Sequence, residues 1–236
     1  MISVVIPVLN EANTIGELLD YLEANSKSEN ISEVIVVDGG STDGTFEILE
    51  SHLDKGNHHT ILLQSPKGRA IQMNHGAQKA TGKVLYFLHA DSLPPKGFDE
   101  YILKYLDKGF LAGCFKMKFD SNHPVLKISQ WFTQFNLKFC RGGDQSLFVS
   151  KRLYEKLGGY NEAFSIYEDC EFINRIYDSD ETKFAVMDDY ITTSARRYRN
   201  NGTWKLQYHF AVIHIKKTLG ASAQSLHSYY DKYIVS

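Results

Sequence analysis

Four acidic residues stand at positions from which carboxylates can meet a ligand. Asp38 directly follows the apolar run 34–37, Asp91 comes shortly after the run 84–88, and Glu168 and Asp169 open an amphipathic segment. The carboxyl ends of the strands in an open parallel sheet form the crevice where ligands bind. We therefore expect Asp38 and Asp91 to open on one ligand-binding pocket.

Each of these acids also has a purely structural interpretation. Asp in the string Asp38-Gly-Gly is common in turns, because its side chain bonds the local backbone. Acidic residues such as Glu168 and Asp169 stabilise a helix N-terminus by about 0.3 to 1 kcal/mol. Taken singly, the acids are therefore weak evidence for chemistry, and the elements that position them carry more weight.

The first 91 residues alternate short apolar runs with amphipathic stretches, which predicts strands followed by helices. Apolar runs rich in β-branched residues suit strands covered on both faces, and helical crossovers make such strands parallel. Thr14 and Glu17 have the spacing of a capping box, and Gly82 has the position of a helix stop. The fold class expected is α/β. Strands are expected over 3–8, 34–37, 60–63 and 84–88, and helices over 14–22, 42–53 and 69–81.

The pattern changes after Pro94. Residues 115–119 alternate apolar and lysine side chains, which predicts a strand with one face in solvent and a mixed or antiparallel second half of the sheet. Ser150 is expected to cap a short helix that ends at Gly158, after a strand over 145–149. Between these strands, five apolar residues recur at helical spacing and predict one apolar helix face. They are Val125, Ile128, Phe132, Phe135 and Phe139.

The composition is that of one compact folded unit. The chain has 236 residues, 43% of them hydrophobic, and a chain of this length buries roughly 70 to 75% of the surface that its unfolded form exposes. With 26 basic and 28 acidic residues the net charge is −2. That balance supplies no broad basic surface for nucleic acid.

No segment predicts export or a membrane span. Residues 2–8 lack the features of a signal peptide, and no apolar run approaches the 18 residues that suggest a spanning helix. Cys114, Cys140 and Cys170 form no Cys-x-x-Cys pair, so we interpret them as reduced core thiols. A cytoplasmic protein is expected.

The strings around the acids are more specific than the acids themselves. They are Ser3-Val-Val-Ile-Pro-Val-Leu-Asn-Glu11, Val37-Asp-Gly-Gly-Ser-Thr-Asp-Gly-Thr45, His89-Ala-Asp91 and Glu168-Asp169. In order and approximate spacing they resemble family 2 glycosyltransferases with the GT-A fold, over about residues 1–200. Gly68-Arg-Ala-Ile-Gln-Met-Asn74 and Gly142-Gly-Asp-Gln145 are further similar to a bacterial subgroup of small soluble members with His-Ala-Asp in place of Asp-x-Asp.

The resemblance implies a nucleotide-sugar donor site, with a UDP-sugar favoured, in a nucleotide-binding half over 1–91. Without the family, Pro7 would end a strand, Asp43 would cap the next helix and Arg69 would be a solvated first-turn side chain. The matching donor residues are Pro7, Asn10 and Glu11 along the nucleoside, Asp38 at the base, and Asp43 and Arg69 at neighbouring positions.

The family places an Asp-x-Asp motif after the fourth strand, and its last carboxylate holds Mg²⁺ or Mn²⁺ against the donor diphosphate. Here the motif is His89-Ala-Asp91, so Asp91 matches the metal ligand. Hard divalent ions take oxygen ligands and share substrate phosphates, which suits this arrangement. His89 has three open interpretations: a hydrogen bond to the donor, a place in the metal shell that would favour Mn²⁺, or simple burial.

In the family, the second acid of the Glu-Asp pair is the catalytic base. The resemblance therefore implies that Asp169 takes the proton of an acceptor hydroxyl, with Glu168 as a helper that orients the acceptor or the base. Such proton transfer typically contributes 10²- to 10⁴-fold. A single displacement at the sugar carbon implies inversion of the anomeric configuration.

The half over 92–200 is expected to bind the acceptor. Asp144 precedes a strand that should flank the acceptor pocket, where it would hold a hydroxyl or simply form a turn. Arg197 lies in Arg196-Arg-Tyr, which resembles a truncated Q-x-x-R-W element of processive members. The alternative for Arg197 is a basic surface turn.

A C-terminal helical segment over 201–236 carries apolar residues at helical spacing, interspersed with lysines, over 204–217. Two interpretations stay open. The segment packs on the domain as core, or it forms an exposed amphipathic surface for a membrane interface or a homodimer. A lipid-linked acceptor, with peripheral attachment to the inner face of the membrane, would fit the second.

Other functions are less well supported. A nucleotidyltransferase would need a Gly-rich, basic loop after the first strand, and residues 8–13 contain neither glycine nor a basic residue. A dehydrogenase would need G-x-G-x-x-G at the same place. A non-catalytic nucleotide-sugar-binding protein of the same fold stays an alternative because of His89, although Glu168 and Asp169 disfavour it.

Overall fold

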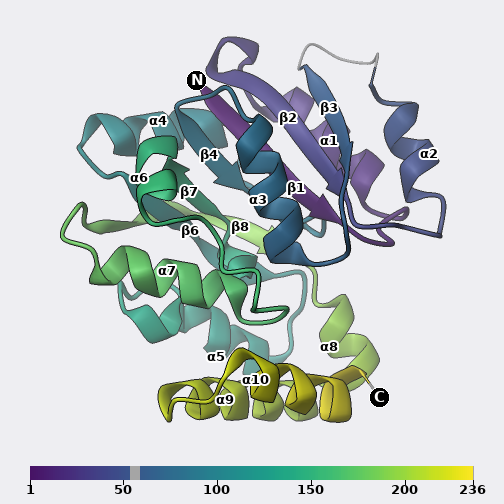
Figure 1. The fold of residues 1–236 in the computed structure, drawn as a ribbon, viewed down its shortest axis with the longest axis vertical. Coiled ribbons are helices and arrows are strands. Elements are labelled where there is room, and N and C mark those ends of the chain that lie inside the picture. The colour runs from purple at the N-terminus through teal and green to yellow at the C-terminus, as the bar shows by residue number, and fades with distance from the viewer. Residues whose placement is uncertain (54–58, 236) are drawn as a thin grey trace.

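The computed structural model describes residues 1–53 and 59–235 of the chain (Figure 1). In this part of the chain, eight strands form a sheet in the order β3-β2-β1-β4-β7-β6-β8-β5. The first four strands of this order run parallel, whereas β7 is antiparallel to both β4 and β6. The predicted α/β class and the mixed second half are confirmed. The strands are β1 (Ile2–Val8), β2 (Ile31–Asp38), β3 (Thr60–Gln64), β4 (Val84–Phe87), β5 (Ser92–Leu93), β6 (Ala112–Phe119), β7 (Leu147–Ser150) and β8 (Phe184–Thr193).

Helices cover both faces of the sheet, which explains why β1 is apolar along its whole length. Val4 packs in a core cluster with α1 and α4, whereas Val5 packs in a second cluster with α3, α6 and α7. Gly76 of α3 lies so close to β1 that a Cβ atom there would stand 2.5 Å from Val5 Cγ1. The helices outside the C-terminal segment are α1 (Ile15–Asn25), α2 (Thr45–Glu50), α3 (Arg69–Lys79), α4 (Phe98–Asp107), α5 (Pro124–Phe132), α6 (Lys151–Lys156) and α7 (Glu168–Asp178).

Local capping follows the predictions in part. Ser150 caps α6, because its hydroxyl accepts a hydrogen bond from Leu153 N at 3.2 Å. The capping box of Thr14 with Glu17 is wrong, since the Thr14 side chain caps no backbone N–H and donates instead to a Glu11 carboxylate oxygen at 3.0 Å. Helix α3 ends at Lys79, before the predicted stop.

The predicted apolar helix face over 125–139 is wrong. Helix α5 ends at Phe132, and Thr133 ties the chain to β6 because its hydroxyl accepts a hydrogen bond from Met117 N at 3.0 Å. The side chain of Arg141 is buried and donates to Thr133 O at 2.6 Å, which holds the loop after α5 in place. Of the five residues expected on this helix face, four are exposed: Ile128, Phe132, Phe135 and Phe139.

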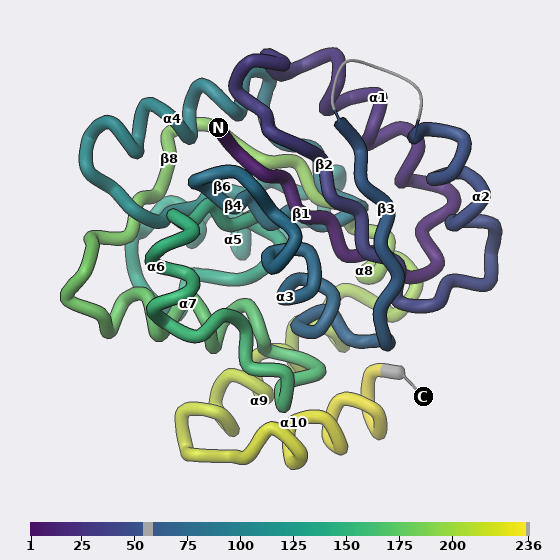
Figure 2. The backbone as a smooth tube through the Cα atoms, turned by 45° about the horizontal axis from the view of Figure 1, so that its top comes forward, coloured from purple at the N-terminus to yellow at the C-terminus, as the bar shows by residue number. Residues whose placement is uncertain are grey.

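The C-terminal helices are α8 (Arg196–Asn201), α9 (Thr203–Thr218) and α10 (Ala223–Tyr230). Helices α9 and α10 form a separate layer below the sheet, and α8 connects the sheet to it, as Figures 1 and 2 show. Leu206 and Ile213 of α9 are buried, so part of this helix packs as core, whereas Trp204, Tyr208 and Ile215 are exposed. Within the described residues, no helix combines the length and the hydropathy that crossing a bilayer requires.

The cysteines are unpaired, as predicted. Cys114 is buried in the core, whereas Cys140 and Cys170 are only half-buried. The interpretation as core thiols therefore holds for Cys114 alone. Burial raises the pKa of all three thiols, which makes them poor nucleophiles at neutral pH.

Candidate active site

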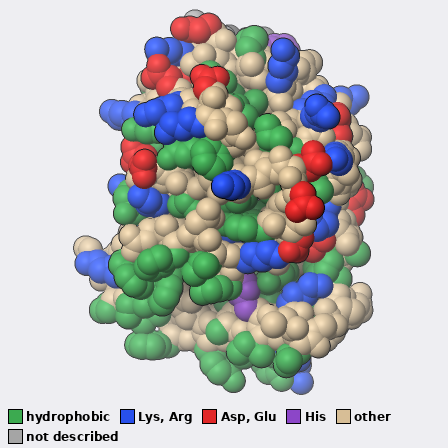
Figure 3. All heavy atoms as spheres, turned by 90° about the vertical axis from the view of Figure 1, so that its left-hand side faces the viewer, with side chains coloured by type: hydrophobic (Ala, Val, Ile, Leu, Met, Phe, Trp, Pro, Cys, Tyr) green, Lys and Arg blue, Asp and Glu red, His purple; other side chains and the backbone are tan. Residues whose placement is uncertain are grey.

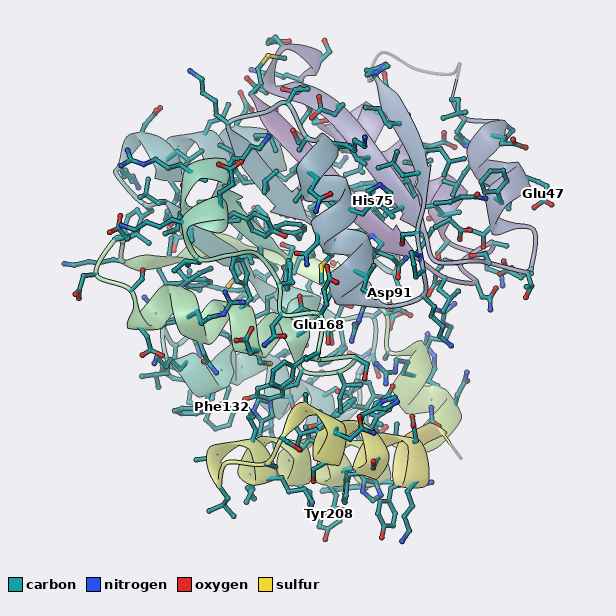
Figure 4. All side chains as sticks on the ribbon, in the orientation of Figure 1. Glu47, His75, Asp91, Phe132, Glu168 and Tyr208 are labelled. Carbon is teal, nitrogen blue, oxygen red and sulfur yellow. The ribbon has the colours of Figure 1, made fainter. Side chains whose placement is uncertain are left out.

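A cavity of about 520 Å³ lies between α7, the loops below the sheet and the C-terminal layer. Figure 4 shows Glu168 and Asp91 in this central region, beneath the sheet. Because the residues of the cavity come from α3, the loop after β4, the turn before β7, α7 and α8, only the folded chain assembles it. Six residues predicted from the sequence line it: Arg69, His89, Asp144, Glu168, Asp169 and Arg197.

His89 lies between two carboxylates. Its Nδ1 atom is 3.6 Å from Asp144 Oδ1, and its Nε2 atom is 3.5 Å from Asp169 Oδ2. Burial lowers the pKa of His89, but the interactions with Asp144 and Asp169 outweigh burial and raise this pKa to about 10. A pKa this high favours the imidazolium form at neutral pH. Both ring nitrogens face carboxylates, and a place for His89 in a metal shell stays a prediction.

The neighbouring carboxylates are ionised for the same reason. Burial acts to raise the pKa of Asp169, but its interaction with His89 dominates and holds that pKa below its ordinary value. The same balance of burial against His89 lowers the pKa of Asp144. Asp169 is therefore deprotonated, as a proton acceptor must be.

Substitution of His89 by Gln is expected to weaken the dependence of stability on pH. Because the pKa of His89 is higher in the folded protein than in the unfolded chain, protonation of His89 stabilises the fold. This stabilisation is complete below the unfolded pKa of about 6.5. It is lost as the pH rises through the folded pKa of about 10. The unfolding free energy of the wild type should therefore fall more steeply between pH 7 and pH 10 than that of His89→Gln. Urea unfolding at both pH values measures this, and parallel losses in the two proteins would contradict the ion pairs.

Arg69 and Glu168 form an ion pair at the wall of the cavity. Arg69 is the first residue of α3, and its Nε atom lies 2.6 Å from Glu168 Oε1. Burial raises the pKa of Glu168, which the charge of Arg69 opposes. In the described part of the chain neither Glu168 oxygen has a partner with hydrogen-bond geometry. Arg69 lies in the first turn of α3, as its structural interpretation has it, and its side chain is 38% exposed, but it is also paired with Glu168, and the pair brings a guanidinium to the cavity.

Gly143 is a site residue that the sequence analysis did not identify. A Cβ atom at this position would lie 2.0 Å from Asp169 Oδ2 and 2.7 Å from His89 Cε1. At Gly142, by contrast, a Cβ atom would meet nothing within 4 Å. The Gly-Gly pair before Asp144 was a visible signal, but only the fold shows which of the two glycines makes room for the acids.

Asp91 adjoins the cavity without lining it. Burial and the negative charge of Asp144 raise the pKa of Asp91, whereas His89 and Arg196 act in the opposite direction. Its carboxylate accepts one long hydrogen bond, from Ser92 Oγ at 3.5 Å. Among the described residues, a half-buried carboxylate with so few partners is suited to a cation.

The surroundings of Asp91 fit a divalent ion held partly by a substrate. The described residues contain no group of three or more His, Cys, Asp or Glu side chains arranged to hold a metal. Mg²⁺ usually keeps several waters and binds through one or two carboxylates and substrate phosphates, so one carboxylate can be sufficient when a substrate supplies the other ligands.

The loops after β1 and β2 are bonded to each other at the predicted donor side. Asn10 N donates to Ser41 Oγ at 2.9 Å, and Thr42 N donates back to Asn10 Oδ1 at 2.9 Å. Asp43 accepts from Ala12 N at 3.1 Å. These hydrogen bonds connect the two loops at the carboxyl ends of β1 and β2, so the predicted donor residues in the loops lie close together.

Asp38 differs from the expectation. It is buried, and its carboxylate accepts hydrogen bonds from Gly40 N at 3.2 Å and Ser41 N at 3.1 Å, which is the turn role. Asp38 and Asp91 do not open together on the cavity, because neither is among the residues that line it. Pro7 lies buried inside β1 rather than at its end.

Arg196 links the loop after β1 to the region of Asp91. Its Nη2 atom donates to both Glu11 oxygens, at 2.9 and 2.8 Å, and its charge acts on Asp91. Sequence reasoning chose the neighbouring Arg197, which lines the cavity and donates to Tyr230 Oη at 2.5 Å. The missed contact spans 185 residues of sequence, so no local pattern indicates it.

Comparison with known proteins adds three findings. The model of the family described as "Glycosyl transferase family 2" matches residues 3–165. The chain is 25% identical over 195 residues to the "Probable glycosyltransferase YdaM" of Bacillus subtilis, covering 75% of this chain and 46% of that protein. It spans between 26% and 57% of the length of four curated relatives.

Two solved structures share the fold at 20% identity. The mannosyltransferase PcManGT from Pyrobaculum calidifontis, in complex with GDP-Man and Mn²⁺, has a TM-score of 0.71 over 97% of this chain and 69% of that one. S. aureus TarS 1-349, in complex with UDP, has a TM-score of 0.68 over 82% of this chain and 60% of that one. Likeness at this identity establishes the fold, which is of the GT-A type.

Proposed function

Because this chain belongs to glycosyl transferase family 2, we propose that it transfers a sugar from a nucleotide-diphosphate sugar to a hydroxyl acceptor. The observation that carries the proposal is the ionised Asp169 in a cavity that adjoins Asp91. A UDP-sugar is favoured as the donor, held by the half of the chain over 1–91. The motif His89-Ala-Asp91 would place the chain in the bacterial subgroup in which His replaces the first Asp of Asp-x-Asp.

Asp169 is the proposed base. An acceptor hydroxyl placed within hydrogen-bond reach of its carboxylate passes its proton to Asp169 as the oxygen attacks the anomeric carbon. The bond from that carbon to the diphosphate breaks on the opposite face, so the configuration inverts. His89 and Gly143 fix the position of Asp169, and Asp144 is placed to hold the acceptor.

The departing diphosphate needs positive charge around it. Arg69 and Arg197 line the cavity and supply guanidinium groups, which suit phosphate recognition because of their fixed donor geometry. Asp91 would hold Mg²⁺ or Mn²⁺, which when bound offsets negative charge on the diphosphate as a Lewis acid. Glu168 keeps Arg69 in place through the 2.6 Å contact.

Nucleotide binding is expected to depend on a divalent ion through Asp91. Wild-type protein should show a rise in melting temperature with UDP that is larger when Mn²⁺ is present, because the ion and the diphosphate bind together. Asp91→Ala should lose the Mn²⁺-dependent increment. A thermal-shift screen of UDP, GDP, dTDP and CMP, each with and without Mn²⁺, measures both the base preference and the metal effect.

The matched control is Glu47→Ala, which removes an exposed acid on the outer side of α2 (Figure 4). Glu47→Ala should keep the whole Mn²⁺-dependent increase in melting temperature with UDP. If Asp91→Ala also keeps this increase, Asp91 does not hold the metal ion. UDP binding without transfer to any acceptor would instead favour the non-catalytic binding protein.

The acceptor side of the cavity supports a lipid-linked acceptor. Phe132 and Phe139 line the cavity and are also exposed on the surface, so its outer end is apolar. Glycosides with an octyl aglycone should therefore be better acceptors than methyl glycosides of the same sugars, with a lower KM. Initial rates over a panel of such pairs measure this, and equal KM values within every pair would contradict the apolar subsite.

A further inference from the structure

Six large apolar side chains cover the outside of α5 and the loop that follows it. We call this the aromatic surface: Ile128, Trp131, Phe132, Phe135, Leu137 and Phe139, which are between 37% and 70% exposed. Figure 3 shows hydrophobic side chains gathered on the lower part of one face of the molecule, below its acidic side chains. Exposed apolar groups that gather in this way mark interaction sites.

The aromatic surface is held rigidly. Arg141, which is 2% exposed, reaches into the protein and donates to Cys114 Sγ at 3.1 Å and to the carbonyls of Thr133 and Phe135. The ring centroids of Trp131 and Phe135 are 4.7 Å apart. The exposure of these rings is therefore built into the fold by buried contacts.

The surface is continuous with the cavity. Phe132 and Phe139 belong to both, and Figure 4 shows Phe132 near the C-terminal helices, below Glu168. Helix α9 borders the same opening, because Gln207 Nε2 donates to Ser129 Oγ of α5 at 3.0 Å. Whatever covers the aromatic surface therefore lies at the outer end of the cavity that contains Asp169.

The segments that form the aromatic surface and the C-terminal helices differ in charge from the rest of the chain. Residues 121–143 and 196–230 contain nine of the 26 basic residues and none of the 28 acidic ones. Three of the nine, Lys138, Arg196 and Arg199, are paired with acids of other segments, and Arg141 is buried, so the lysines of α5 and α9 carry the exposed charge. Lys127 on α5, which also carries Ile128 and Trp131, and Lys205 on α9 are exposed. Both tryptophans of the chain, Trp131 and Trp204, are more than half exposed in these segments.

We propose that the aromatic surface docks on an anionic lipid bilayer, with the opening of the cavity facing the lipid. Apolar and aromatic groups enter the boundary between headgroups and acyl chains, while the surrounding cations attract anionic headgroups. The exposed lysines Lys127 and Lys205, on a chain whose net charge is −2, are the charge complement of such a membrane. Docking itself does not require the proposed transferase activity, but its purpose as a way to reach a lipid-linked acceptor rests on it.

Fluorescence of the two tryptophans tests the docking directly. Vesicles of phosphatidylcholine with phosphatidylglycerol should shift the emission of the wild type to the blue and sediment the protein, and phosphatidylcholine alone should bind at least about tenfold more weakly. The double variant Ile128→Ser, Trp131→Ser should lose at least about tenfold in vesicle affinity. Lys127→Glu with Lys205→Glu should remove the preference for the anionic lipid.

The matched control is Tyr190→Ser, which removes an exposed ring on β8, outside the aromatic surface, and should bind vesicles like the wild type. Absence of vesicle binding by the wild type would overturn the proposal, as would equal binding by the double variant. A concentration-dependent dimer in sedimentation velocity that the double variant abolishes would assign the surface to a second copy instead.

Nucleotide binding separates this proposal from the proposed function. The thermal shift with UDP and Mn²⁺ should be the same in the double variant and the wild type, because neither substituted residue lines the cavity. Vesicle binding without any nucleotide binding would contradict the transferase alone. Nucleotide binding without vesicle binding would contradict the docking alone.

Discussion

Asp169→Asn is expected to lower kcat by about 10²- to 10⁴-fold while the dissociation constant of UDP changes little. The amide has the size of the carboxylate but cannot accept the proton of the acceptor hydroxyl. UDP affinity should persist because Arg69 and Asp91, not Asp169, are the proposed contacts of the diphosphate. Steady-state kinetics with the identified donor, together with calorimetric titration of UDP, measure the two quantities.

The control for this substitution is Glu162→Gln, which changes an exposed acid outside the cavity and should leave kcat unchanged. Full activity of Asp169→Asn would remove the base assignment. Loss of UDP affinity in parallel with kcat would mean that Asp169 organises the donor site rather than accepting a proton.

Gly143→Ala is expected to produce a folded protein with very low activity. The added Cβ atom would lie 2.0 Å from Asp169 Oδ2, and a carboxylate at the end of a side chain yields to such a contact by rotating away. Displacing a catalytic group by about 1 Å costs about 10²-fold in rate, so we expect a loss of at least that size in kcat. Kinetics together with the melting temperature separate this effect from unfolding.

Gly142→Ala provides the matched comparison one residue away. A Cβ atom there would meet nothing within 4 Å, and the backbone is extended at φ −165. Activity should therefore be close to that of the wild type. Equal activity of the two alanine variants would show that Asp169 does not need the position that the structure gives it.

The parallel half of the sheet could be predicted from the sequence because its physical cause is local. Val4 and Val5 belong to the core clusters on opposite faces of the sheet, and both are apolar because helices cover both faces. The strand therefore reads as a continuous apolar run, which is easy to identify in the sequence. The loop acids at the ends of these strands were also visible.

The prediction of one apolar helix face over 125–139 failed because long-range contacts end the helix. The spacing of Phe132, Phe135 and Phe139 suits a helix, but Thr133 bonds to β6 and Arg141 holds the following loop, so the helix ends early. The same contacts turn apolar side chains outward. Periodicity alone does not distinguish a helix that faces a core from an exposed apolar surface.

In the candidate site, too, the sequence identified residues, whereas the contacts between them follow only from the fold. Asp169 and His89 were identified from short strings, yet the placement of the imidazolium between Asp144 and Asp169 follows only from the fold. The assignment of Asp38 to the donor base stays a prediction, and the fold adds that its carboxylate accepts hydrogen bonds within its own turn. Arg196 was missed because its partner, Glu11, is distant in sequence.

A crystal structure with an intact UDP- or GDP-sugar and Mn²⁺ tests the central claim most directly. The claim is that Asp91 and Asp169 serve one bound donor. We predict that the diphosphate lies between Asp91 and Arg69 and that the anomeric carbon faces the opening in which Asp169 and Asp144 lie. Electron density for the nucleotide sugar at any other place, with the cavity filled by solvent, would contradict the account.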